Sequence, residues 1–458
     1  MRIVLADLKS PGITKDTVAA GFGSRLPSFS RLTRLTSRFK GWFQDLPSLQ
    51  LAYLAAIFAR WGHEVRTTEG PFLPGDLAIV LSSLVDYRRE VSWCEEMRRR
   101  GVRVGLVGMA VSCLPELFRD HADFLILGEP EAAATAIARG ERPNGLLNSP
   151  PMADLDALPF PRWDLVGADA GAPLTLPLAS RPFRGVLPVL ASRGCSESCT
   201  YCPHRVLGGY RARSTKNVAD ELEHLCHGEG RYVVFRDPIF TRSRERCLEL
   251  CAAIAERGLK LHFECETRLD CLDESLIDSM MNVGLRALTF GVETTSPAVL
   301  RRVARRPVPD AHQKAVIAHC RRRHVSTTAF YMIGFPEDDQ ASIGATIAYA
   351  VELGSTFAQF KLLTPYPGTP LWKQLAHRVY ERDWERFDGF TPTFQHPSLT
   401  PEQLRDRLGA AYTRFYGRPS YVADYCGLRS HWLRAIFHAM DRATVRRPPD
   451  SLAWAAEE

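Results

Sequence analysis

The chain has 458 residues, of which 45% are hydrophobic and 24% charged, and its formal net charge is +6. This composition is typical of a soluble globular protein of two or three domains and excludes a disordered or fibrous chain. The net charge is too small to indicate nucleic-acid binding by itself.

Two features predict a cytoplasmic protein. Asp7 and Lys9 interrupt the first apolar run, so no secretory signal is predicted, and no apolar run approaches the roughly 18 residues of a membrane span. Nine of the twelve cysteines are scattered in apolar or amphipathic surroundings, which fits small buried side chains in a reducing compartment.

Residues 1–140 alternate apolar strands with amphipathic helices, which predicts a Rossmann-like, doubly wound parallel sheet. Ligands of such sheets bind at the carboxyl ends of the strands. The long basic stretch 9–48, after the first strand, is either a solvated insertion or a flap over a ligand. The expected strands are residues 2–8, 75–85, 101–111 and 122–131, with a helix and a further strand within 49–65.

A linker rich in proline and turns, residues 141–185, leads to a second array. Six strand–helix units in residues 186–375 predict a partial (βα)6 barrel of the TIM type, two units short of eight. Residues 376–458 are expected to form a mainly helical, substrate-facing cap. Its basic stretch either packs with a solvated face or contacts an anionic membrane peripherally. The expected barrel strands are 186–192, 231–237, 260–266, 286–293, 325–334 and 358–366.

Three cysteines follow the first barrel strand in SRGCSESCTYCPHR, residues 192–205. Thiolates favour zinc, copper(I) or iron–sulfur clusters, and clusters normally take four cysteines. Three would hold three irons of a cubane and leave the fourth open to a small molecule. A zinc site completed by His204 is disfavoured because His204 is too close to Cys202 in sequence. The predicted ligands are Cys195, Cys199 and Cys202.

Cys-x3-Cys-x-aromatic-Cys at this place resembles the signature of the radical S-adenosylmethionine (SAM) superfamily. Further segments, among them FLILGEPE, FRDPIFT, LTFGVETTS and FYMIGFPED, resemble in the same order the subfamily that carries an N-terminal cobalamin-binding domain. The resemblance covers almost the whole chain. It implies a 4Fe–4S cluster with SAM chelated at the open iron. It also implies a deoxyadenosyl radical that removes hydrogen from carbon, a step that the cofactors and not the protein side chains perform.

The resemblance also implies roles by position. Tyr201 is expected near the adenine, Glu293 at the SAM ribose or amino group, and Arg268 at the SAM carboxylate, which a guanidinium matches well. A structural salt bridge is the rival explanation for each charged residue. Asp237 and Glu266 also end strands and are expected at this rim, and Gly334 and Pro336 either allow close backbone approach to the adenine or form an ordinary turn.

The cobalamin expectation has one weakness. Many cobalamin domains bind cobalt through Asp-x-His-x-x-Gly, whereas this half of the chain has only His63 and His121, neither in that pattern. Cobalamin therefore binds without a histidine beneath cobalt, or the domain binds nothing. The loops expected to hold cobalamin contain Ser82, Ser83, Gly108, Ser112, Gly128 and Glu129.

The resemblance implies cobalamin-dependent C-methylation in a biosynthetic pathway, with methylcobalamin as donor and a second SAM to restore it. Radical cyclisation, ring contraction or oxidative rearrangement without methyl transfer is the alternative, and a non-catalytic cobalamin- or metal-binding regulator is another. A methylthio-transferase would need a second cluster, but the N-terminal domain has only Cys94 and Cys113. The expected partners are a lipid, tetrapyrrole or natural-product intermediate as substrate and a flavodoxin or ferredoxin as electron donor. No nucleic acid and at most weak self-association are expected.

Overall fold

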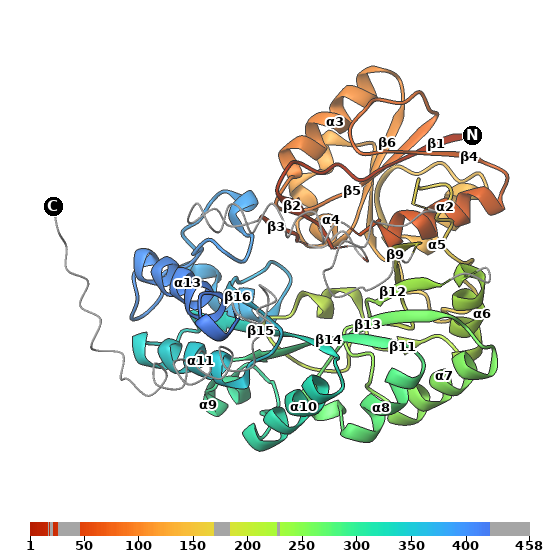
Figure 1. Cartoon of the computed structure of the whole chain (residues 1–458). Helices are drawn as coiled ribbons and strands as arrows, with labels where there is room; N and C mark the ends of the chain where they lie inside the picture. The colour runs from red at the N-terminus through yellow and green to blue at the C-terminus, as the bar shows by residue number, and fades with distance from the viewer. Residues whose placement is uncertain (17, 19–21, 26–45, 169–183, 227–229, 422–458) are drawn as a thin grey trace.

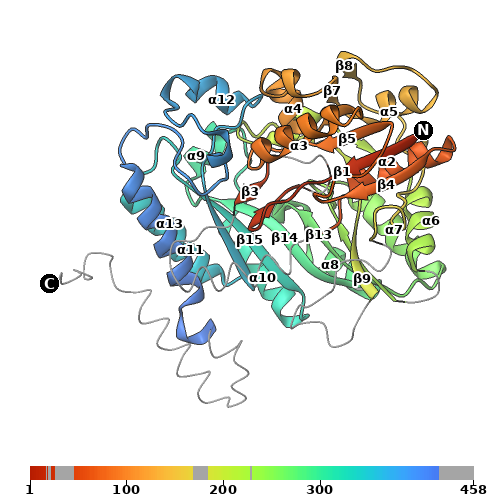
Figure 2. The same ribbon diagram turned by 90° about the horizontal axis from the view of Figure 1, so that it is seen from above.

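The structure is a computed structural model that describes residues 1–16, 18, 22–25, 46–168, 184–226 and 230–421. Two α/β domains lie one above the other, and the C-terminal helix α13 (Pro401–Tyr416) lies at the side of the second domain (Figure 1). Seen from above, the N-terminal domain covers one side of the second sheet, and α13 flanks the other side (Figure 2).

The N-terminal domain is a six-stranded parallel sheet in the order β4-β1-β5-β6-β7-β8. Its central strands are almost wholly apolar, so both faces need cover. Helices α2 and α5 pack on one face, and α3 and α4 on the other. The strand order reverses between β1 and β5, which is where doubly wound sheets bind ligands. The bounds are β1 Arg2–Ala6, α2 Leu49–Arg60, β4 Glu64–Thr68, β5 Leu77–Leu81, α3 Tyr87–Arg99, β6 Arg103–Val107, α4 Met109–Cys113, β7 Phe124–Gly128, α5 Glu131–Ala138 and β8 Gly145–Ser149.

Strand β8 lies within the segment expected to be a linker and was not predicted. It pairs in parallel with β7 at the edge of the sheet. Its sequence, GLLNS, is short and largely exposed, so it has neither the alternation nor the apolar run that marks a strand.

The second domain confirms the predicted partial barrel. Six parallel strands form a curled sheet in the order β16-β15-β14-β13-β12-β9, with helices between them. The strand bounds are β9 Arg184–Val189, β12 Arg231–Phe235, β13 Leu261–Thr267, β14 Leu285–Glu293, β15 Ser326–Ile333 and β16 Phe357–Leu362. The helix bounds are α6 Thr215–Cys226, α7 Arg244–Glu256, α8 Glu274–Asn282, α9 Pro297–Arg302, α10 Asp310–Arg322, α11 Gln340–Leu353 and α12 Pro370–Leu375.

The barrel strands have two different faces. Along β13, β15 and β16 buried residues alternate one by one with half-buried residues. Successive side chains of a strand point to opposite faces. The buried set, for example Phe263 and Phe360, belongs to the core beneath the helices. The half-buried set therefore lines the concave inner face.

Helix α13 protects the open edge of the half-barrel. The Tyr412 hydroxyl accepts a hydrogen bond from the N–H of Phe360 at 3.2 Å and donates to its carbonyl at 2.9 Å. Tyr416 does the same to Ala358 at 3.0 and 2.7 Å. Both residues lie on β16, whose outer backbone groups would otherwise be unpaired.

The described part of the cap is less helical than expected. Between α12 and α13 the chain forms short 3-10 turns and one isolated bridge from Val379 to Phe394. The rest of the predicted cap, residues 422–458, lies outside the described residues, as do most of the residues of the basic stretch 9–48. Within the described ranges, no helix combines the length and apolarity that crossing a bilayer demands.

The tyrosine contacts predict a specific loss of stability. Tyr412→Phe removes a hydroxyl that satisfies two backbone groups, so the free energy of unfolding should fall by about 1–3 kcal/mol in urea titrations. Tyr380→Phe is the control, because Tyr380 is 44% exposed and its hydroxyl donates to a single carbonyl, that of Pro392. Equal, small losses in both variants would contradict this role.

Candidate functional site

The cysteine loop is fixed where it leaves β9. Asp237 accepts hydrogen bonds from the Ala191 N–H at 3.0 Å and the Ser192 hydroxyl at 2.5 Å. Gly194 has φ +72°, and a Cβ there would lie 2.2 Å from the carbonyl oxygen of Gly209. Asp237 is buried behind the loop and does not line the pocket described below. The structure thus places it as a positioning residue for the loop.

All three predicted cysteine ligands line one pocket at the carboxyl ends of the barrel strands. Cys199 is buried, and Cys195 and Cys202 are half-buried. Burial raises the pKa of the Cys195 thiol and raises that of Cys202 to about 12. Metal binding therefore displaces protons from these thiols. The other lining residues include Glu197, Tyr201, His204, Glu266, Thr267, Arg268, Thr289, Gly291, Glu293, Arg305 and Phe330.

This donor set fits an iron–sulfur cubane. Three soft thiols converge on one pocket, and each can bind a different iron. Among the described residues, no three His, Cys, Asp or Glu side chains form a site for a single metal ion. A cubane requires no such shared position, because its irons occupy separate corners.

Glu293 and Arg305 form the polar wall of the pocket. Glu293 ends β14 with φ +68°, a conformation that residues other than glycine seldom adopt and that clusters at functional sites. Arg305 Nη2 lies 3.4 Å from Glu293 Oε1, and its other nitrogen donates to the Tyr201 hydroxyl at 3.3 Å. A Cβ on Gly291 would lie 2.0 Å from Glu293 Oε1, so only glycine leaves room for this pair. Burial raises the pKa of Glu293, although Arg305 opposes the change.

Arg268 lies in the same pocket as a buried cation. It pairs with Asp270 at 2.9 Å and Glu197 at 3.2 Å. Glu266 also lines the pocket and forms an ion pair with Arg236. The pocket thus presents carboxylates and guanidinium groups, the partners that the ammonium and carboxylate of an amino acid require.

The IGFP turn lies beside this pocket without lining it. The N–H groups of Gly334 and Phe335 donate to Asp338, and the Phe335 ring packs edge-on against Tyr201 at 6.5 Å. Gly334 and Pro336 thus flank Phe335, whose ring contacts Tyr201 of the pocket.

Sequence reasoning missed Arg305. It lies in RRVARRP, a run that reads as a basic surface. Only the turn after α9 brings it back to the carboxyl end of β14, where it is largely buried. The available signal was a basic run, residues 301–306, in the segment that follows the carboxylate at the end of a predicted strand.

Buried ion pairs join the cysteine loop to the N-terminal sheet. Arg193, two residues before Cys195, pairs with Glu131 at 2.8 Å. Glu129 pairs with Arg211 at 2.6 Å and lies 3.4 Å from Arg193. These carboxylates follow β7, so the carboxyl ends of the two sheets face each other. Glu129, expected in a cofactor loop, is committed to this contact.

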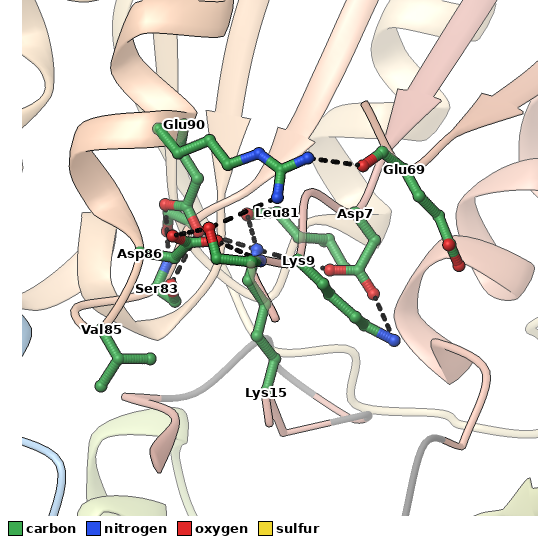
Figure 3. A network of polar contacts seen from close by, with 12 residues as sticks. Asp7, Lys9, Lys15, Glu69, Leu81, Ser83, Val85, Asp86 and Glu90 are labelled. Atoms are coloured by element: carbon green, nitrogen blue, oxygen red, sulfur yellow. Dashed lines mark hydrogen bonds and ion pairs between the residues drawn. The ribbon is translucent and has the colours of Figure 1, made fainter. Parts of the chain in front are cut away.

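A second buried polar network lies at the carboxyl ends of β1 and β5 in the N-terminal sheet (Figure 3). Lys15 pairs with Glu90 at 2.8 Å and with Asp7 at 3.4 Å, and the Ser83 hydroxyl donates to Glu90 at 2.7 Å. Burial by itself lowers the pKa of Lys15, but the two carboxylates outweigh it and hold that pKa above its usual value. The start of the basic stretch is therefore anchored over this edge.

At β6 and β7 the same edge carries small groups. The Ser112 hydroxyl donates to the Gly108 carbonyl at 2.8 Å and accepts from the Gly128 N–H at 2.9 Å. The buried Ser82 hydroxyl donates to the Val107 carbonyl at 2.8 Å. The expected serines and glycines thus gather at one edge.

Both histidines of this half lie at the opposite edge of the sheet. His63 precedes β4 and contacts the N-terminal amine and the Ala138 carbonyl. His121 lies just before β7 and pairs with Glu95 at 2.6 Å. Neither histidine is placed to approach a ligand at the carboxyl edge.

A larger hollow of about 670 Å³ also lies at the amino edge, where α3 ends and β6 begins. It is lined by Arg98, Arg99, Arg103, Glu95 and Asp123. Doubly wound sheets bind their ligands at the other edge, so the cysteine pocket is the better functional candidate.

The family model described as the Radical SAM superfamily matches residues 189–350, which include the cysteine loop and five of the six strands at least in part. This part of the chain, which holds the cysteine loop, thus matches a radical SAM domain. The match supports the predicted activity of a radical SAM enzyme, with a 4Fe–4S cluster and SAM as its cofactors.

Three relatives show how far the likeness extends. An uncharacterized methyltransferase of Pyrococcus horikoshii is 27% identical over 418 residues, 82% of this chain and 89% of the relative. The methyltransferase TsrM of Kitasatospora setae, solved with cobalamin and a 4Fe–4S cluster, has a TM-score of 0.62 at 15% identity and covers 91% of this chain and 88% of its own. OxsB, a cobalamin-dependent SAM radical enzyme solved with aqua-cobalamin and SAM, has a TM-score of 0.64 at 10% identity. The match covers 97% of this chain and 71% of OxsB. The two-domain fold is shared with both.

The ion pair between the domains yields a stability prediction. Arg193→Met leaves the buried Glu131 carboxylate without its cation and should lower the free energy of unfolding by about 3–5 kcal/mol. Arg162→Met is the control, because Arg162 forms an exposed pair with Asp164 and should cost at most about 1 kcal/mol.

The same variant should respond differently to acid. Burial opposes ionisation of Glu131, but Arg193 and Gln50 outweigh it and hold the Glu131 pKa below its usual value. Such a group stabilises the fold above its unfolded pKa and loses this contribution only as pH falls through its folded pKa. The wild type should therefore lose this contribution only below about pH 4.3. Arg193→Met should become unstable at higher pH, and unchanged acid profiles would contradict the assignment.

Proposed function

We propose that this protein is a cobalamin-dependent radical SAM C-methyltransferase. One observation carries the proposal. The pocket of three thiols faces the carboxyl edge of a doubly wound sheet, and the Arg193–Glu131 pair holds the two together. A substrate carbon between the domains would thus be close to both a radical source and a ligand of the sheet.

Cys195, Cys199 and Cys202 would hold the cluster, and the sheet edge would hold cobalamin. When bound, the cluster supplies the electron that cleaves the SAM sulfonium, and cobalamin supplies a transferable methyl group. An external reductant such as flavodoxin or ferredoxin would deliver that electron.

The chain's own residues orient SAM. Glu293 accepts from an ammonium or ribose hydroxyl, and Arg305 beside it partly opposes the rise in the Glu293 pKa that burial causes. Arg268 offers a guanidinium to the SAM carboxylate, although Glu197 and Asp270 share it. Tyr201, backed by Phe335, provides an aromatic face for the adenine.

Two features support the cobalamin site. The expected serines and glycines have small side chains, so they leave space at the ends of β6 and β7. At the neighbouring β5, Lys15 and Glu90 pair with each other. With His63 and His121 at the far edge, cobalamin would bind without a histidine from this domain. The methyltransferase name of the Pyrococcus relative and the cobalamin of TsrM support the same assignment.

A second candidate is cobalamin-dependent radical chemistry without methyl transfer. OxsB favours it, since OxsB shares the fold and is described as a radical enzyme and not as a methyltransferase. The two candidates differ in their products. Anaerobic enzyme with SAM labelled in its methyl group should form deoxyadenosine, S-adenosylhomocysteine and a labelled product if methyl transfer occurs. Deoxyadenosine alone, with an unlabelled product, would support the second candidate.

The cluster assignment predicts the effect of removing one ligand. Cys199→Ala should lose most of its iron and sulfide after anaerobic reconstitution and should form no deoxyadenosine from SAM and dithionite. Cys320→Ala is the matched control, because Cys320 is a buried cysteine on the outer helix α10. Retained cleavage in Cys199→Ala would contradict the assignment.

The role of Glu293 predicts a change in SAM binding at constant cluster content. Glu293→Gln should weaken SAM binding by about 10- to 100-fold, because a hydrogen bond to a charged group contributes about 1.5–3 kcal/mol. Glu223→Gln, on the exposed face of α6, should bind SAM as the wild type does. A Glu293→Gln variant with full iron content and unchanged affinity would exclude Glu293 as a SAM contact.

A further inference from the structure

The concave face of the half-barrel carries charged residues beyond those assigned to SAM. Arg236 follows β12, Glu264 and Glu266 lie on β13, and Lys361 lies on β16. Glu264 and Glu266 belong to the half-buried set of β13, and Lys361 to that of β16, so these three point inward. Glu266 also lines the cysteine pocket, which makes this charged face continuous with the cluster site.

Three of these four charged residues already have a polar partner. Arg236 pairs with Glu266 and lies 3.4 Å from Asp16 of the basic stretch. The Tyr232 hydroxyl donates to Glu264 at 3.4 Å. Each of these groups therefore has a partner within the protein.

Lys361 is the exception. Its ammonium makes no hydrogen bond and no ion pair with any residue that the structure describes, and it lies 5.7 Å from the centre of the Phe390 ring. The nearby Asp388 is already engaged, because it accepts from the N–H groups of Phe390 and Thr391 at 2.7 and 2.8 Å. Burial lowers the pKa of Lys361, and the carboxylates of Asp388 and Glu266 offset only part of this effect.

The surrounding backbone keeps Lys361 in this position. Gly389 has φ +79°, and a Cβ there would lie 3.1 Å from Lys361 Cδ, so glycine makes room for the lysine stem. The carbonyl of Gly389 accepts from the N–H of Leu362 at 2.8 Å. On the other side, Lys361 is in register with Met332 of β15, whose neighbour on the inner face, Phe330, lines the cluster pocket.

We propose that Lys361 is the anion-binding residue of the substrate site and that the substrate carries an ionised oxyanion, a carboxylate or a phosphate. This inference rests on the proposed function, since it takes the concave face as the substrate side of the cluster pocket. An ammonium has three donors and no acceptor, and the half-buried Lys361 has no partner for them among the described residues. A wholly apolar lipid would leave it unpaired, whereas an oxyanion satisfies it and anchors the substrate beside the cluster.

The test measures the accessibility of the amine in the complete enzyme. Holoenzyme with cluster, SAM and cobalamin is treated with acetic anhydride, and acetylation of each of its eight lysines is quantified by mass spectrometry. The probes are succinate, inorganic phosphate and the neutral succinamide. A bound anion at ten times its dissociation constant should slow labelling of Lys361 about tenfold, whereas succinamide should have no effect. Protection by succinate alone indicates a carboxylate substrate, and protection by phosphate alone indicates a phosphate ester.

Two outcomes would overturn the proposal. One is that neither anion slows the labelling of Lys361 at concentrations up to about 100 mM, because a dissociation constant above that value is too weak for a specific site. The other is complete protection by cobalamin alone, shown by comparing enzyme prepared with and without it, because Lys361 would then face the cofactor.

Variants give an independent readout. In equilibrium dialysis with the radiolabelled probe that protects Lys361, Lys361→Met should bind at least about tenfold more weakly than the wild type, and Lys361→Arg should recover part of the affinity. Lys314→Met is the control, because Lys314 already pairs with Asp310 and Glu352 on the surface. Equal binding in Lys361→Met and the wild type would refute the role. None of these measurements uses methyl transfer, so their failure would leave the proposed function standing, and failure of methylation would leave the anion site standing.

Discussion

The buried contact of Arg193 with Glu131 is the constraint on which the rest of the site depends. Arg193 belongs to the cysteine loop, and Glu131 begins the helix after the last central strand of the N-terminal sheet. A buried carboxylate and a buried guanidinium tolerate separation poorly, because each would be left desolvated without a partner. The pair therefore fixes both the direction of the cysteine loop and the side of the N-terminal domain that faces it.

The fold and the gathering of three cysteines in one pocket were predictable because their signals are local. Three cysteines at fixed spacing need no tertiary information, and the apolar strands of both sheets stand out against polar turns. Strand β8 escaped prediction because an exposed edge strand has no apolar pattern. Arg305 and Lys361 escaped because each becomes meaningful only when the curvature of the half-barrel turns it toward the pocket.

The residues expected to bind cobalamin in the N-terminal domain fall into two groups. Gly108, Ser112 and Gly128 lie together at the carboxyl edge of β6 and β7, as strand-end positions predict. Ser83 and Glu129 lie at the same edge but are committed to buried polar contacts, one with Glu90 and the other with Arg211. A sequence shows which residues end a strand, whereas the partner that each side chain finds depends on the opposing domain.

The central claim is that three thiols hold a cubane whose fourth iron binds SAM within the pocket of Glu293 and Arg305. The most direct measurement is electron–nuclear double resonance of the reduced, anaerobically reconstituted enzyme with SAM labelled by nitrogen-15 at its amine. The account predicts a nitrogen-15 hyperfine coupling that disappears when unlabelled SAM replaces the labelled compound. A reduced cluster without such coupling at saturating SAM, or zinc in place of iron, would contradict it.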